Sequence, residues 1–75
     1  MLKLSKSAIE EIAKNTNAPI INRMTEEEQA ELKKSDSPSI LAFSFSKVNG
    51  VITSSLYVGK SGKLYYELGQ NHFSW

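Results

Sequence analysis

The sequence predicts an α+β domain in which two short N-terminal helices pack on one face of a three-stranded antiparallel β-meander. Residues 39–68 hold three runs rich in β-branched and aromatic residues, separated by Asn49-Gly50 and by the glycine-flanked turn 59–62. The preceding part instead holds two capping signals, each followed by residues of high helix propensity. With 75 residues, the chain is expected to form one small domain, residues 1–75, with a thin core.

The first predicted helix spans residues 8–14. Ser7 and Glu10 form a capping-box pattern, in which the serine hydroxyl accepts from the Glu10 backbone N–H and the carboxylate reaches back. Three apolar residues then fall on one helical face at i, i+3 and i+4, namely Ile9, Ile12 and Ala13. Because two turns of helix are marginal in water, we expect this helix to dock on the sheet.

The second predicted helix spans residues 26–34 and begins with a clearer capping box, formed by Thr25 and Glu28. Carboxylates occupy its first turn and lysines its last turn, which complements the helix dipole at both ends. Its interior holds two apolar residues, Ala30 and Leu32, so most of this helix is expected to face solvent. The acidic helix is a further candidate surface, suited to imitating a charged partner or to meeting a basic one.

Three strands are predicted at residues 39–48, 51–58 and 63–69. Asn49-Gly50 is the commonest sequence of a two-residue type I′ turn, which predicts a tight first hairpin. The second hairpin is expected to turn through a three-residue loop, with Gly62 in the left-handed conformation.

The registers that these turns predict agree on one apolar face. The first hairpin places Phe43 opposite Leu56, and the second places Leu56 opposite Tyr66. Alternation along the strands then puts one set of residues on the same side, namely Leu41, Phe43, Phe45, Ile52, Leu56, Val58, Leu64, Tyr66 and Leu68. We expect both helices to cover this face.

The opposite sheet face centres on Tyr57 and Tyr65, which the predicted register places directly across from each other, with Glu67 in the next row. Small hydroxyl residues around a tyrosine pair are typical of a solvated face with a favourable cross-strand contact. The alternative is a contact surface, because tyrosine is enriched at protein interfaces.

The last three residues of the chain include two large aromatic residues, Phe73 and Trp75. Folded back over an open part of the thin core, either ring adds about 1.5–3 kcal/mol of apolar burial. The alternative is that the two rings bind a partner. The sequence leaves both open.

Composition argues against several functional classes. The chain has no cysteine and one histidine, so disulfides and thiolate metal sites are excluded and a structural zinc site is not expected. Since no catalytic motif stands out, we expect a non-enzyme without cofactor or metal. No apolar run approaches the roughly 18 residues needed to cross a bilayer. The sequence therefore predicts a cytoplasmic protein without a membrane partner.

The function that these features favour is a small non-enzymatic protein-interaction module, an adaptor or inhibitor that covers part of another protein. Proteins this small are often phage or mobile-element effectors, which is an association rather than a chemical argument. The predicted partner-binding residues are Tyr57, Tyr65, Glu67, Phe73, Trp75, Glu27 and Glu31.

Two alternatives remain for the binding partner. The tyrosine face and the loop residues Lys47, Lys60 and Lys63 suit single-stranded nucleic acid, although a net charge of +1 gives little backbone affinity. Strand 39–48 holds one charged residue and lies at a sheet edge, which favours a homodimer through paired edge strands.

Overall fold

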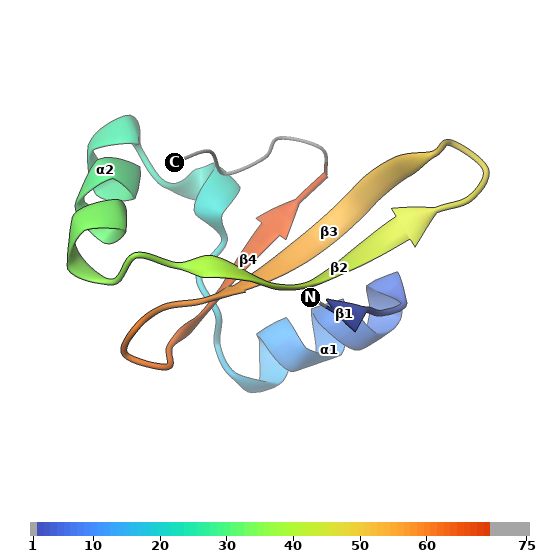
Figure 1. Cartoon of the computed structure of the whole chain (residues 1–75), viewed down its shortest axis with the longest axis horizontal. Helices are drawn as coiled ribbons and strands as arrows, with labels where there is room; N and C mark the ends of the chain where they lie inside the picture. The colour runs from blue at the N-terminus through green and yellow to red at the C-terminus, as the bar shows by residue number, and fades with distance from the viewer. Residues whose placement is uncertain (1, 70–75) are drawn as a thin grey trace.

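The computed structural model describes residues 2–69, which form a mixed four-stranded sheet with helices on both sides (Figure 1). The elements follow in the order β1 (Leu2–Lys3), α1 (Lys6–Asn15), the 3-10 helix η1 (Ile21–Arg23), α2 (Glu26–Ser35), β2 (Ser39–Ser46), β3 (Val51–Val58) and β4 (Leu64–Leu68). The strands lie in the order β1-β2-β3-β4. The α+β class is confirmed, but the predicted three-stranded meander lacks the parallel strand β1.

Helix α1 begins two residues earlier than the sequence predicted. The Ser5 hydroxyl caps it by accepting from the Ala8 backbone N–H at 3.2 Å, whereas Ser7 lies inside the first turn. Strand β1 explains the shift, because the Leu4 N–H donates to the Phe43 carbonyl at 2.8 Å and holds the chain extended up to Ser5. The predicted Ser7 cap is therefore wrong, since a tertiary contact selects between two serines.

Helix α2 has the predicted capping box. The Glu28 N–H donates to the Thr25 hydroxyl at 3.1 Å, and the Thr25 N–H donates to the Glu28 carboxylate at 3.0 Å. Both bonds join residues three apart in sequence, so they form wherever this segment is helical. The helix extends one residue beyond the predicted end.

The two hairpins differ in how well their registers were predicted. In the second, Leu56 pairs with Tyr66 and Tyr57 with Tyr65, as expected. In the first, Ser46 pairs with Val51 across a four-residue loop, 47–50, and the predicted two-residue turn is wrong.

The conformation of the loop explains this difference. A type I′ turn needs positive φ at both central residues, and only Gly50, at +67°, adopts it here. The loop closes instead through a bond from the Gly50 N–H to the Ser46 carbonyl at 2.7 Å.

The shifted register changes which residues of β2 face each side of the sheet. Leu56 pairs with Ala42, and Phe43 pairs with Ser55 on the opposite face. Two register irregularities, between Ile40 and Ala42 and between Ser44 and Phe45, break the alternation that the prediction assumed. The small residues Ala42 and Ser44 are buried, while Leu41 and Phe45 of the predicted apolar face are exposed.

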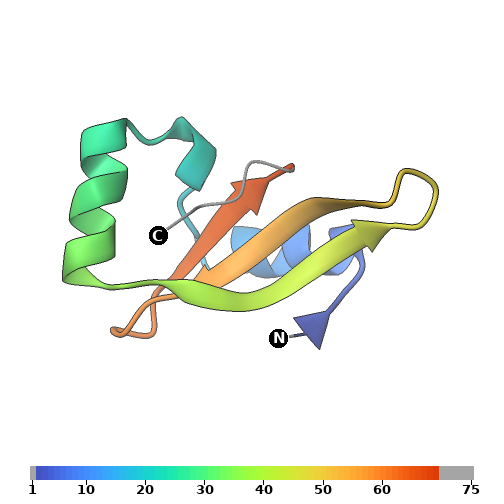
Figure 2. The same ribbon diagram turned by 45° about the horizontal axis from the view of Figure 1, so that its top comes forward.

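The core consequently has two parts, one on each face of the sheet. One cluster joins α1 to the strands and comprises Ile9, Ala13, Ala42, Leu56 and Tyr66. The other joins η1 and α2 to the strands and comprises Ile21, Leu32, Tyr57 and Tyr65. Neighbouring strand residues point to opposite faces, so α1 packs on one face, while η1 and Leu32 of α2 pack on the other. The prediction that both helices pack on one face is therefore wrong. Figure 2 shows α1 behind the strands and α2 beyond their end.

Both outer strands of the meander have a neighbour that covers part of their free edge. Strand β1 pairs with β2 at Ala42 and Phe43. Along β4, the Tyr66 N–H donates to the Pro19 carbonyl at 2.9 Å. The Asn22 side chain makes the next two hydrogen bonds along this edge. Its Oδ1 accepts from the Leu68 N–H at 2.7 Å, and its Nδ2 donates to the Leu68 carbonyl at 2.9 Å. Such cover reduces edge-to-edge pairing between copies.

Candidate interaction surfaces

The tyrosine face, expected to be open, is buried beneath η1 and α2. Tyr57 and Tyr65 are each 4% exposed and Glu67 is 2% exposed. The Tyr57 hydroxyl donates to Glu67 Oε1 at 3.1 Å, and the Tyr65 hydroxyl donates to Asp36 Oδ2 at 2.7 Å. The structure thus brings these three predicted site residues together, but inside the protein, so the solvated sheet face is wrong.

Asp36 is the polar centre that sequence reasoning missed. Besides the Tyr65 hydroxyl, its carboxylate accepts from the Ser61 N–H at 2.7 Å and from the Ser61 hydroxyl at 2.8 Å. Gly59 leaves room for this carboxylate, since a Cβ at that position would overlap its atoms. Ser61 and Tyr65 are 25 and 29 residues away from Asp36 in sequence, so no local sequence pattern predicts the cluster.

These contacts shift the ionisation of both partners. The hydrogen bond from Tyr65, followed by those from Ser61, lowers the pKa of Asp36 below its ordinary value. Burial, and then the hydrogen bond to Asp36, raises the pKa of Tyr65 to about 12. The cluster therefore holds a carboxylate beside a neutral phenol across a wide pH range.

The β2–β3 hairpin carries an exposed apolar surface that was not predicted. Its loop projects beyond the rest of the molecule (Figures 1 and 2), and Val48 in that loop is 95% exposed. Phe45, at the base of the loop, is 42% exposed, and the Lys3 Nζ lies 5.4 Å from the centre of its ring. We call Lys3, Phe45, Lys47 and Val48 the hairpin surface.

Glu27 and Glu31, the predicted acidic site residues, lie on one wall of a shallow groove beside α2. The groove has a volume of about 480 Å³ and is lined by Pro19, Met24, Glu27, Glu28, Glu31, Leu32, Ser35, Lys63 and Tyr65. The Lys63 Nζ lies 5.7 Å from the centre of the Tyr65 ring. This α2 groove therefore combines apolar and aromatic side chains with a rim on which carboxylates outnumber the single lysine.

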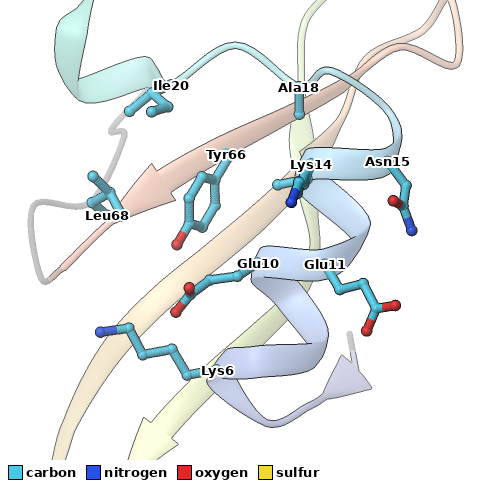
Figure 3. Close-up of a pocket in the computed structure, with 10 residues that line it drawn as sticks. Lys6, Glu10, Glu11, Lys14, Asn15, Ala18, Ile20, Tyr66 and Leu68 are labelled. Carbon is cyan, nitrogen blue, oxygen red and sulfur yellow. The ribbon is translucent and has the colours of Figure 1, made fainter.

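A second and larger groove, of about 800 Å³, separates α1 from the end of β4 (Figure 3). Tyr66 and Glu10 project into it from opposite sides, and Lys6 and Lys14 stand along the helix. Burial, and then the charge of Glu10, raises the pKa of Tyr66 above its ordinary value, against a lowering by a hydrogen bond with Ser54. With lysines and glutamates on the same helix, this α1 groove has no net preference for one sign of charge.

The described residues hold neither a group of three potential metal ligands nor a helix long and apolar enough to cross a membrane. Phe73 and Trp75, the remaining predicted site residues, lie outside the described residues. Comparison of the chain with protein-family models, curated proteins and solved structures found no match.

Proposed function

We propose that this protein is a small non-enzymatic interaction module that binds another protein through the hairpin surface. The observation that carries the proposal is the position of Val48, an apolar side chain almost wholly in solvent on a loop that projects from the body. Transfer of such a side chain into a partner's pocket contributes about 1.5–3 kcal/mol of apolar burial. A projecting loop suits insertion into a cleft, which is how an adaptor or inhibitor covers part of its target.

The buried polar cluster around Asp36 is suited to holding the fold rather than to catalysis. Both carboxylate oxygens of Asp36 are occupied by donors from the protein itself, and the Tyr65 hydroxyl is one of these donors. An active site instead presents such groups to an open pocket, where a substrate can reach them.

Single-stranded nucleic acid is the second candidate, and the hairpin surface rather than the tyrosine face supports it. Phe45 offers a partly open ring for stacking, and the Lys3 Nζ lies over that ring. Lys47 follows two residues later in the chain and adds a second cation that can neutralise phosphates. Binding of this kind would weaken steeply with salt and on Phe45→Ala. An affinity that changes neither with salt concentration nor on Phe45→Ala would argue against nucleic acid as the partner.

The proposed function is tested by affinity capture with the immobilised protein and two matched variants. Val48→Ser removes the apolar side chain at the loop, whereas Leu41→Ser removes another exposed apolar side chain of β2 outside the loop. We expect one protein to be retained by the wild type and by Leu41→Ser, and to be lost from Val48→Ser. Equal retention by all three would contradict a role for the hairpin.

A further inference from the structure

The two ends of the molecule carry complementary surfaces. The molecule is about 35 Å long and 20–22 Å across, with α2 at one end of the long axis and the β2–β3 loop at the other (Figure 1). Residues 39–58, which form the hairpin, hold a single charged residue, Lys47, and Lys3 adds a second cation beside Phe45. The α2 end instead carries the groove rimmed by Glu27, Glu28 and Glu31.

The α2 groove has the shape and chemistry for a small apolar group with a cation next to it. Its apolar lining comes from Pro19, Met24 and Leu32, together with the Tyr65 ring. Among the glutamates of its rim, Glu28 already accepts from the Thr25 N–H in the capping box. Glu27 and Glu31 lie four residues apart, on the same side of the helix, and are exposed.

We propose that the α2 groove binds the β2–β3 loop of a second copy of this chain. Val48 would lie on the apolar lining, and Lys47 would lie between the carboxylates of Glu27 and Glu31 of the other copy. The inference rests on the proposed function, because it takes the hairpin surface as the binding element and names a partner for it. Charge complementarity and the small size of both surfaces favour this occupant over a larger domain.

The position of the two surfaces determines the kind of assembly. Hairpin and groove are different surfaces at opposite ends of one molecule, so the contact is heterologous and each copy keeps one surface free. Copies therefore add head to tail. The contact is small, which corresponds to weak association with a dissociation constant on the order of 0.1–1 mM.

Sedimentation velocity from about 10 µM to about 1 mM tests the proposal, because this range spans the expected constant. We expect the wild type to exceed its monomer mass of 8.4 kDa as concentration rises. The hairpin variant Lys47→Ser/Val48→Ser and the groove variant Glu27→Lys/Glu31→Lys should each remain monomeric. Mixed together they should form a dimer and stop there, since one intact hairpin meets one intact groove.

Two further variants control for non-specific effects. Leu41→Ser/Lys60→Ser removes one apolar and one cationic side chain outside the hairpin surface, and Glu11→Lys/Glu26→Lys reverses two charges that do not line the α2 groove. Both should associate like the wild type, with circular dichroism confirming that all variants are folded.

The results separate this inference from the proposed function. A wild type that stays monomeric to about 1 mM, or a mixture that forms no dimer, would overturn the inference. The loss of a captured protein from Val48→Ser would still support the proposed function in that case, because the capture assay does not depend on self-association.

Discussion

The two faces of the sheet are held by different kinds of interaction. Under α1, the buried side chains Ile9 and Leu56 pack by apolar contact. Under η1 and α2, the buried rings of Tyr57 and Tyr65 are fixed through their hydroxyls to carboxylates. Helix α2 itself buries a single residue, Leu32.

The contrast shows how a helix with a narrow apolar stripe can still be held in place. Apolar burial is non-directional and scales with area, so α1 needs a broad contact. Hydrogen bonds to a charged group are directional and stronger than neutral ones, so a few of them can position the segment that follows α2. We therefore expect substitutions that change side-chain volume on the α1 face to lower stability most. On the α2 face, we expect stability to depend on pH and on single hydrogen-bonding groups.

The largest effect is expected on the α1 face, from Leu56→Ala. Truncation of a buried leucine costs about 2–5 kcal/mol, which is comparable with a total stability on the order of 5 kcal/mol for a domain this small. Urea unfolding followed by circular dichroism measures the loss. Val48→Ala is the control and should change stability by less than about 0.5 kcal/mol, because Val48 is exposed. Equal effects of the two substitutions would mean that Leu56 is not in the core.

On the α2 face, Asp36→Asn should lower stability and remove a pH dependence. The pKa of Asp36 is lowered by folding, so its contribution is complete above the ordinary aspartate pKa of 3.8 and is lost as the pH falls below it. Lys63 is the nearby charge that also favours the carboxylate. Urea midpoints between pH 2 and pH 6 should therefore fall more steeply for the wild type than for Asp36→Asn. Parallel curves would show that Asp36 does not contribute.

The Tyr65 phenol should titrate near pH 12, whereas an ordinary tyrosine titrates near 10. Because folding raises this pKa, the stability from Tyr65 is present below pH 10 and is lost as the pH rises towards 12. The absorbance of tyrosinate near 295 nm, compared between the wild type and Tyr65→Phe, isolates this group. A difference spectrum centred at pH 10 would contradict the buried hydrogen bond.

Capping of α1 offers a smaller and more local test. Ser5→Ala should cost about 1 kcal/mol, since it removes the acceptor for the Ala8 N–H, whereas Ser7→Ala should be close to neutral. Thermal unfolding of the two variants compares them directly. A larger loss of stability for Ser7→Ala than for Ser5→Ala would show that Ser7 is the cap, as the sequence predicted.

The smallest expected effect concerns two buried serines of β3. Ser54 Oγ lies 2.7 Å from Ser44 Oγ, whereas Ser55 Oγ is buried without a hydrogen-bond partner among the described residues. Ser54→Ala should therefore lower stability, and Ser55→Ala should leave it unchanged or raise it by up to about 1 kcal/mol. The unfolding free energies of the two variants, each compared with the wild type, are the measurement. A lower unfolding free energy for Ser55→Ala would show that the Ser55 hydroxyl has a hydrogen-bond partner.

The candidate site was only partly predictable. Glu27 and Glu31 were expected to form an acidic surface, and the structure gives them a common groove wall because a helix places residues four apart side by side. Tyr57 and Tyr65 were predicted to be cross-strand neighbours, which is confirmed, but their burial depends on η1 and α2. Their binding role stays a prediction. Val48 was missed because the predicted two-residue turn made it a strand residue.

What the sequence alone determined about this protein is local. The capping box of α2 joins residues three apart, and the second hairpin follows from the Gly62 turn and the alternation beside it, so both were predicted correctly. The tertiary structure alone decided the register of the first hairpin, the cap of α1 and the face that each helix covers. These depend on contacts between distant segments, such as β1 with β2, and a one-residue change in pairing reverses the faces of a strand. Local patterns carry no information about such contacts.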